Sequence, residues 1–302
     1  MNSPKDTRYA HLLPEVRAVA DLSIEERILY ISTDRWLPYT RAIEVLDSLE
    51  DLLKKPRINR PPNVMLLARS SNGKSHILER FADLHPGIPN VNGPNILAPV
   101  ILIDAPPSGQ AKDLYTIILE MLNRPPPKSS GVAERERAAV DILGKVDTKI
   151  LMIDEINHLL AGSTSRQKEF MFALKHLSNQ LKMSLVIAGT PESVQVLRLS
   201  DQLENRFKTE GLPIWTLVSE LRLLLANFEQ VLPLRETSSL SLKSTAAMIS
   251  SFGVETIGSI SSLLNDAAIA ALKSGQEKIT VELLRQCAPL TRLQKNKMRA
   301  SL

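Results

Sequence analysis

The sequence predicts an α/β protein in which a parallel sheet is preceded and followed by helical segments. Four short apolar runs between residues 63 and 190 alternate with amphipathic stretches, which is the pattern of a parallel sheet covered by helices. Residues 8–56 and the part of the chain after Trp215 instead follow the period of helices. We therefore expect three successive parts: an N-terminal helical segment at 1–58, an α/β core at 59–216, and a helical lid with a basic C-terminal tail at 217–302.

The predicted elements follow in order along the chain. Two helical stretches at 22–32 and 40–55 are separated by TDRWLPY, and the proline-rich PRINRPPN ends this segment. The predicted strands are NVMLLA at 63–68, APVILIDA at 98–105, TKILMIDE at 148–155 and MSLVIAGT at 183–190, with PIW at 213–215 as a candidate fifth strand. NRPPPKSSG at 123–131 is predicted to be a surface loop. Near the C-terminus, Thr280 is a candidate helix N-cap and Gly275 closes the preceding helix.

Composition and charge exclude several classes of protein. Hydrophobic residues at 43% and charged residues at 23% are ordinary for a folded chain and argue against disorder. The net charge of +4 is compatible with nucleic-acid binding but too small to indicate it. The single cysteine, Cys287, excludes an internal disulfide and indicates a reducing compartment. No apolar window is long enough to span a membrane and the N-terminus lacks a signal-peptide core, so we expect a cytoplasmic protein with no membrane partner.

The stretch ARSSNGKS at 68–75 has the parts of a phosphate-binding loop. It follows an apolar strand and precedes the helical HILERFADL, so the backbone N–H groups at the helix start would face an anion. Lys74 would reach the outer phosphates of ATP, the hydroxyl of Ser75 would hold Mg²⁺, and Gly73 would allow close approach. The candidate nucleotide-binding residues of the loop are Ala68, Arg69, Ser70, Ser71, Asn72, Gly73, Lys74, Ser75 and His76.

The strand TKILMIDE ends in two adjacent carboxylates, Asp154 and Glu155. Two acids at the end of a buried strand are unfavourable unless they hold a metal or act on water. Asp154 would bind the nucleotide's Mg²⁺ together with Ser75, and Glu155 would polarise the attacking water. The alternative is a strand that ends in two solvated acids, which the presence of the upstream loop in the right order argues against.

Two further residues complete a candidate hydrolysis site. Thr190 ends the strand of VIAGTPES and could hydrogen-bond the γ-phosphate or its water, although a plain strand-to-helix turn would look similar. Arg206 in DQLENRFKTE could reach a neighbouring subunit's nucleotide and stabilise charge in the transition state, although an exposed surface arginine fits the spacing equally. The candidate catalytic residues are Lys74, Glu155, Thr190 and Arg206.

These motifs, in this order and followed by a helical lobe, resemble those of AAA+ ATPases with a P-loop NTPase core, and more closely those of the TniB family of transposition proteins, which is related to TnsC. The resemblance covers roughly residues 30–290; its most specific stretches are DRWLPYTRAIEVLDSLEDLL, PRINRPPNVMLL, NGKS and AGTPES followed by QLENRF. It implies an ATPase, with ATP and Mg²⁺, that assembles on double-stranded DNA as an ATP-dependent ring or helical oligomer and disassembles on hydrolysis. It also implies a DDE transposase of the TniA kind and a target-selection protein of the TniQ kind as partners, with Arg206 acting in trans.

The chain departs from the family pattern at one position and uses a permitted variant at another. Ala68 stands where phosphate loops usually carry their first glycine; the family pattern accepts alanine there, which requires only a negative φ. Ser261, in TIGSISSLL, stands where many AAA+ proteins have an arginine that contacts the γ-phosphate. We therefore expect weaker or different nucleotide sensing by the lid.

The DNA contacts are the least defined part of the prediction. By resemblance they come from loops after the core strands, where Lys112, Arg166 and Lys168 are candidates, although a single charge of this kind is more often a solvated surface charge. The basic tail RLQKNKMRASL could bind DNA or the transposase, or be a frayed terminus. Two other functional classes stay open: a P-loop phosphotransferase, and a nucleotide-binding adaptor without significant hydrolysis.

Overall fold

The computed structural model describes residues 8–91, 93–199, 204–216 and 218–289. The chain forms two compact units, one of which joins Met1–Tyr39 to Ile214–Leu302, while the other is Thr40–Pro213. The division into segments at 1–58, 59–216 and 217–302 stays a prediction. The basic tail at 292–302, which we considered for binding DNA or the transposase, lies outside the described residues.

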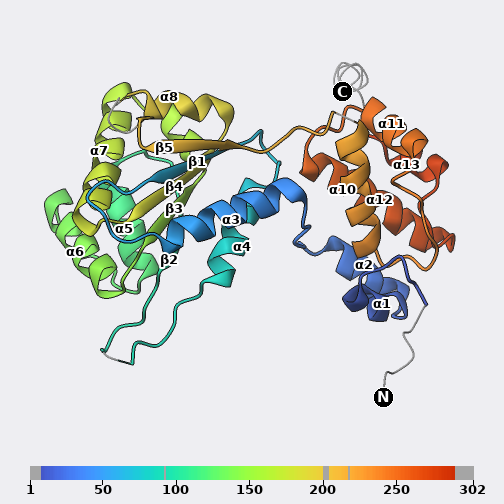
Figure 1. Cartoon of the computed structure of the whole chain (residues 1–302), viewed down its shortest axis with the longest axis horizontal. Helices are drawn as coiled ribbons and strands as arrows, with labels where there is room; N and C mark the ends of the chain where they lie inside the picture. The colour runs from blue at the N-terminus through green and yellow to red at the C-terminus, as the bar shows by residue number, and fades with distance from the viewer. Residues whose placement is uncertain (1–7, 92, 200–203, 217, 290–302) are drawn as a thin grey trace. The chain divides into compact units, whose positions relative to one another are not determined.

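The unit Thr40–Pro213 is built on a five-stranded parallel sheet (Figure 1). Its strands are β1 (Asn63–Leu67), β2 (Val100–Asp104), β3 (Ile150–Asp154), β4 (Ser184–Gly189) and β5 (Phe207–Gly211), in the order β2-β3-β4-β1-β5. Leu66 lies opposite Ala188, and Asp104 lies opposite Asp154. The predicted α/β class and the four predicted strands are confirmed. Because all strands run the same way, the loops that follow them meet at one edge of the sheet, here called the carboxyl edge; the opposite edge is the amino edge.

The fifth strand is not where the sequence placed it. PIW at 213–215 forms no strand, and β5 instead consists of FKTEG, in which only Phe207 and Glu210 are buried. This strand pairs with β1 at the side of the sheet, so it has a neighbour on one side only. The prediction was wrong because it rested on an apolar run. A strand at the side of the sheet needs little apolar surface, and β5 is defined by its pairing with β1.

Helices cover both faces of the sheet. The unit contains α3 (Thr40–Lys54), α4 (Lys74–Leu84), α5 (Ala111–Met121), α6 (Val132–Lys145), α7 (Thr164–Leu181) and α8 (Val194–Leu197), with 3₁₀ turns η1 (Ile156–Ala161) and η2 (Pro191–Ser193). Met65, Ile153 and Ile187 form one apolar cluster with buried residues of α5, α6 and α7. The alternate strand residues Leu66 and Met152 are also fully buried, and α4 contacts β2, β3 and β4. Figure 1 shows these helices around the sheet.

The proline-rich loop between α5 and α6 is fixed by a buried arginine. Arg135 donates hydrogen bonds to the hydroxyl of Ser130 at 2.9 Å, to the carbonyl of Pro127 at 3.3 Å and to the hydroxyl of Thr116. The guanidinium is 7% exposed, so these oxygens take the place of water around its charge. The loop predicted at 123–131 is therefore present, and its conformation is set from inside the protein.

The other unit is helical. Its described helices are α1 (Pro14–Ala20), α2 (Ile24–Ser32), α10 (Val218–Val231), α11 (Lys243–Ser251), α12 (Ile257–Ser274) and α13 (Val281–Cys287). Two predicted ends are confirmed: the hydroxyl of Thr280 accepts a hydrogen bond from the N–H of Leu283 at 3.3 Å, and Gly275 ends α12 with φ of 72°. No helix among the described residues has the length and apolarity needed to cross a membrane.

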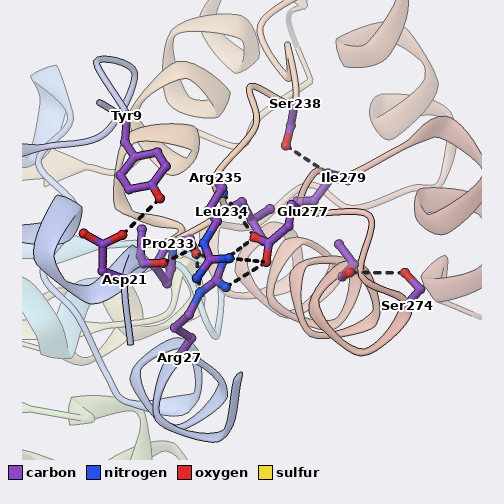
Figure 2. A network of polar contacts seen from close by, with 12 residues as sticks. Tyr9, Asp21, Arg27, Pro233, Leu234, Arg235, Ser238, Ser274, Glu277 and Ile279 are labelled. Atoms are coloured by element: carbon purple, nitrogen blue, oxygen red, sulfur yellow. Dashed lines mark hydrogen bonds and ion pairs between the residues drawn. The ribbon is translucent and has the colours of Figure 1, made fainter. Parts of the chain in front are cut away.

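Figure 2 shows the polar network that joins α2 to the C-terminal helices of this unit. Arg27 is 1% exposed; its Nε donates to the carbonyl of Pro233 at 2.9 Å and its Nη1 to Oε1 of Glu277 at 2.9 Å. The backbone N–H of Arg235 also donates to Glu277, at 3.3 Å. A buried guanidinium requires such partners, so the network couples the folding of α2 to that of the C-terminal part of the chain.

Candidate nucleotide-binding site

The loop between β1 and α4 leaves the sheet at the carboxyl edge and turns sharply into the helix. The turn uses positive φ at Ser71 (56°) and at Gly73 (85°), which is the N-cap of α4. For Ser71 this conformation costs roughly 1–2 kcal/mol, whereas glycine adopts it freely. Ala68 is not among the positive-φ residues, and its N–H donates to the carbonyl of Gly189 at 3.1 Å, which ties the start of the loop to the end of β4. Alanine therefore fits the first loop position.

Lys74 is directed into the loop rather than into solvent. Its side chain is 4% exposed, and Nζ donates to the carbonyl oxygens of Ala68 at 3.2 Å and Arg69 at 3.3 Å. Main-chain carbonyls are neutral, so they solvate the ammonium without neutralising it. Asn72, which is 2% exposed, donates from its side-chain amide to the carbonyl of Pro213 at 2.8 Å and holds the loop against the segment after β5. The result is a fixed loop around a buried positive charge, as an anion site requires.

The candidate metal-binding pair comes together behind this loop. Asp154 ends β3 and is 4% exposed, and the hydroxyl of Ser75 in α4 donates a hydrogen bond to its carboxylate. Burial raises the pKa of Asp154, and the charge of Glu155 adds to this effect; the hydrogen bond from Ser75 and the charge of Lys74 oppose it. A buried carboxylate with a raised pKa gains from a cation beside it, so the pair suits a hard divalent ion.

Glu155 has an unusual backbone and a fixed side chain. Its φ is 52° and its N–H donates to Oδ1 of Asp154 at 2.7 Å. The side-chain amide of Asn157 donates to Oε2 of Glu155 at 2.8 Å. Strained backbone conformations of this kind concentrate at functional sites. This hydrogen bond orients the carboxylate and occupies Oε2 rather than Oε1.

Thr190 follows β4 at the same edge, where its hydroxyl already has a partner. Its hydrogen bond to Glu192 is the largest cause that lowers the pKa of that carboxylate. Gly189, the residue before it, has no space for a side chain, since a Cβ would lie 2.6 Å from Cγ2 of Ile156 and from Oγ of Ser193. The turn is therefore tightly packed, and Thr190 lies at the correct edge in the arrangement of a strand-to-helix turn.

Arg206 lies at the opposite end of the sheet. It precedes β5, its carbonyl accepts from the N–H of Asn63 at 3.0 Å, and its Nη1 donates to Oδ1 of Asn179 at 2.9 Å. Since β1 runs from Asn63 to the candidate phosphate loop, a strand length of roughly 13 Å separates Arg206 from that loop. The structure thus gathers Lys74, Ser75, Asp154 and Glu155 at the carboxyl edge and places Arg206 at the amino edge.

The remaining candidates are spread over other elements. His76 is exposed on α4, and Arg69, Ser70 and Ser71 are exposed at the tip of the loop. Lys112 is half-buried at the start of α5, whereas Arg166 and Lys168 are exposed in the first part of α7. Ser261 is half-buried near the start of α12.

Two further polar residues lie at the carboxyl edge and were not predicted from the sequence. Asn157 holds Glu155, and its own Oδ1 is buried without a hydrogen-bond partner in the structure. Asp104 ends β2 directly opposite Asp154 and is exposed. The signal for Asp104 was present, because APVILIDA ends in an acid just as TKILMIDE does. Asn157 offered none, since an amide two residues after the acids fits any turn.

A parallel sheet in the order β2-β3-β4-β1-β5, with a candidate phosphate loop after β1 and two acids at the end of β3, has the α/β architecture that the sequence predicted. The family model described as "Bacterial TniB protein" matches residues 27–217. The chain therefore belongs to the TniB family.

Solved structures share this fold at low sequence identity. Aeropyrum pernix ORC2, in ADPNP–ADP complexes, is 15% identical with a TM-score of 0.60, covering 90% of this chain and 74% of that chain. Cdc6p from Pyrobaculum aerophilum is 17% identical with a TM-score of 0.59, covering 85% and 69%. Aeropyrum pernix ORC1, in complex with DNA, is 14% identical with a TM-score of 0.57, covering 86% and 68%. No curated protein matches the chain.

Proposed function

We propose that the chain is an ATP-dependent switch that assembles on duplex DNA and leaves it when ATP is hydrolysed. The observation that carries the proposal is the buried ammonium of Lys74, held by neutral carbonyls beside the Ser75–Asp154 pair. A buried positive charge within a loop at a helix start favours a phosphate anion. Membership of the TniB family supports the choice of DNA transposition as the process that the switch serves.

The residues of the carboxyl edge divide the chemistry among them. The N–H groups of the loop and Lys74 would hold the phosphates, and Ser75 and Asp154 would hold Mg²⁺, which when bound would neutralise phosphate charge. No group of three or more His, Cys, Asp or Glu side chains that could hold a metal occurs in the described ranges. Glu155, fixed through Oε2 by Asn157, takes up the proton of the attacking water at Oε1.

Hydrolysis then requires a second subunit. Arg206 is a strand length away from its own loop, farther than its side chain spans, so it can act only on a nucleotide bound by a neighbour. A contact between the amino edge of one copy and the carboxyl edge of the next is heterologous, and it repeats into a ring or an open helix. Such an assembly on DNA would present a repeated surface to a DDE transposase of the TniA kind and a protein of the TniQ kind.

The decisive experiment compares the wild-type chain with Glu155→Gln on duplex DNA. We expect wild-type protein to form rings or filaments with ATP and to dissociate as ATP is consumed, as seen by electron microscopy and phosphate release. Glu155→Gln should bind ATP, stay assembled and lose turnover by about 100-fold or more. Lys74→Ala should not bind nucleotide and should not assemble on its own, although its amino edge stays intact, and Lys145→Ala, an exposed lysine of α6, is the matched control. Equal assembly without nucleotide would exclude the switch.

A second candidate function is a nucleotide-binding adaptor without significant hydrolysis. Two observations favour it: the hydroxyl of Thr190 is engaged by Glu192, and Ser261 brings no charge to the start of α12. The same experiment separates the two functions. Adaptor behaviour requires ATP-dependent assembly of the wild-type chain with no phosphate release above that of Glu155→Gln.

A further inference from the structure

A cavity of about 550 Å³ opens at the amino edge of the sheet. It is lined by Arg60, Pro61, Pro62, Asn205 and Arg206. The first three residues lead into β1 and the last two lead into β5, and these strands are neighbours. The cavity therefore belongs to the unit Thr40–Pro213 and lies at the far end of the sheet from the phosphate loop of the same chain.

Two arginines line this cavity, and no described carboxylate forms an ion pair with either of them. Arg206 donates to the amide oxygen of Asn179, which is neutral, and Arg60 is exposed. Within the part of the chain that the structure describes, neither arginine has a carboxylate at ion-pair distance. The nearby Glu204 instead lies 3.8 Å from Arg198. Two arginines that line one polar cavity without a described carboxylate partner suit an anion.

The segment that carries Arg60 is anchored at both ends. Arg57 donates to the carbonyls of Leu181 and Thr148 and to the carboxylate of Asp147, which anchors the segment at one end. At the other end, Oδ1 of the buried Asn63 accepts from the N–H of Leu185 at 2.8 Å. Pro61 and Pro62 restrict the backbone between these anchors. Arg60 is therefore held beside the cavity with little backbone entropy left to lose on binding.

We propose that Arg60 and Arg206 together bind the terminal phosphate of a nucleoside triphosphate that is held by a second copy of this chain. The inference rests on the proposed function and adds Arg60 as a residue that contacts the neighbour's nucleotide. Planar guanidinium groups match phosphate oxygens in pairs, and two of them spread the charge that develops on the transferred group. The cavity is large enough to hold one phosphate group together with residues of the second copy's phosphate loop.

Mixing variants tests whether Arg60 acts across a subunit contact. Arg60→Ala keeps its own nucleotide site, whereas Lys74→Ala has no nucleotide but an intact amino edge. We expect Arg60→Ala alone to hydrolyse ATP about 10- to 100-fold more slowly with unchanged ATP affinity, as the loss of one charge-assisted contact predicts. Addition of Lys74→Ala protein should restore a large part of the turnover, and Arg206→Ala should behave in the same way. Arg137→Ala, an exposed arginine of α6, is the control and should match wild type.

Four results would overturn the inference, and one of them also removes the function beneath it. Wild-type turnover by Arg60→Ala, with Arg206→Ala impaired, would leave the switch intact and exclude Arg60. Rescue of Arg206→Ala but not of Arg60→Ala would show that Arg60 acts within its own chain. Normal turnover with lost DNA binding would assign the cavity to a DNA phosphate. Absence of ATP turnover in the wild-type chain on DNA would refute the proposed hydrolysis, and the role of Arg60 with it.

Discussion

Replacing Arg27 by methionine should destabilise the unit that contains α2 and the C-terminal helices. Methionine keeps the apolar stem of the side chain and removes the guanidinium, which is 1% exposed and bonded to Pro233 and Glu277 (Figure 2). Removing one partner of a buried ion pair costs about 3–5 kcal/mol because the other charge is left unpaired. Glu277 is 19% exposed and keeps the N–H of Arg235, so we expect the lower end of this range, about 3 kcal/mol.

The destabilisation should depend on pH in a defined direction. The hydrogen bond from Arg27 is the largest cause that lowers the pKa of Glu277 from its ordinary value of 4.5. A carboxylate with a lowered pKa in the folded state contributes stability that is fully present above its unfolded pKa and lost as the pH falls through the folded value. The deficit of Arg27→Met should therefore be full near pH 7 and shrink below pH 4.5.

Tryptophan fluorescence measures this unit alone. The chain has two tryptophans, Trp36 and Trp215, and both belong to the unit formed by Met1–Tyr39 and Ile214–Leu302. Urea titrations near pH 7 and near pH 4 would give the free energy of unfolding. Arg8→Met is the matched control, because Arg8 is 66% exposed in its pair with Asp21 and should change stability by less than about 0.5 kcal/mol. A deficit of Arg27→Met below about 1 kcal/mol, or one that grows in acid, would refute the reasoning.

Three further predictions concern the candidate nucleotide site. Gly189→Ala should lower the free energy of unfolding by about 1–3 kcal/mol, because the new Cβ would lie 2.6 Å from Ile156 and Ser193. Gly131→Ala is the control, because no atom lies within 4 Å of the Cβ it would add. Equal thermal unfolding of the two variants would contradict the prediction. Asn157→Ala should reduce ATP turnover by about 10-fold or more at unchanged ATP affinity, because it removes the hydrogen bond that holds the carboxylate of Glu155. Unaltered turnover in a steady-state assay would exclude a positioning role for Asn157. Burial raises the pKa of Asp154, so the charged carboxylate destabilises the nucleotide-free fold at pH values above its unfolded pKa. Asp154→Asn should therefore raise the Tm of the nucleotide-free protein at neutral pH, lose this gain near pH 3, and abolish Mg²⁺-dependent ATP binding. A lower Tm at neutral pH would contradict the assignment.

Much of the carboxyl edge could be predicted because its signals are local. An apolar run, a glycine before a lysine and a helical period lie next to one another in the sequence, and together they define β1, the loop and α4. In a parallel sheet every strand delivers its last residue to the same edge, so the positions of Asp154, Glu155 and Thr190 relative to the sheet follow from where their strands end. Thr280 and Gly275 were predictable for the same reason, since helix caps are set by a few neighbouring residues.

Tertiary structure alone decided the sheet order, the fifth strand and the amino edge. FKTEG becomes β5 only because β1 offers it a free side to pair with. Arg60 and Arg206 are far apart in the sequence and line one cavity because β1 and β5 are neighbours. Arg27 and Glu277, which are 250 residues apart, meet within one compact unit. Strand pairing and burial of charge are interactions between distant segments, so no local pattern specifies them, whereas turns, caps and periodic faces are specified by residues within a few positions of each other.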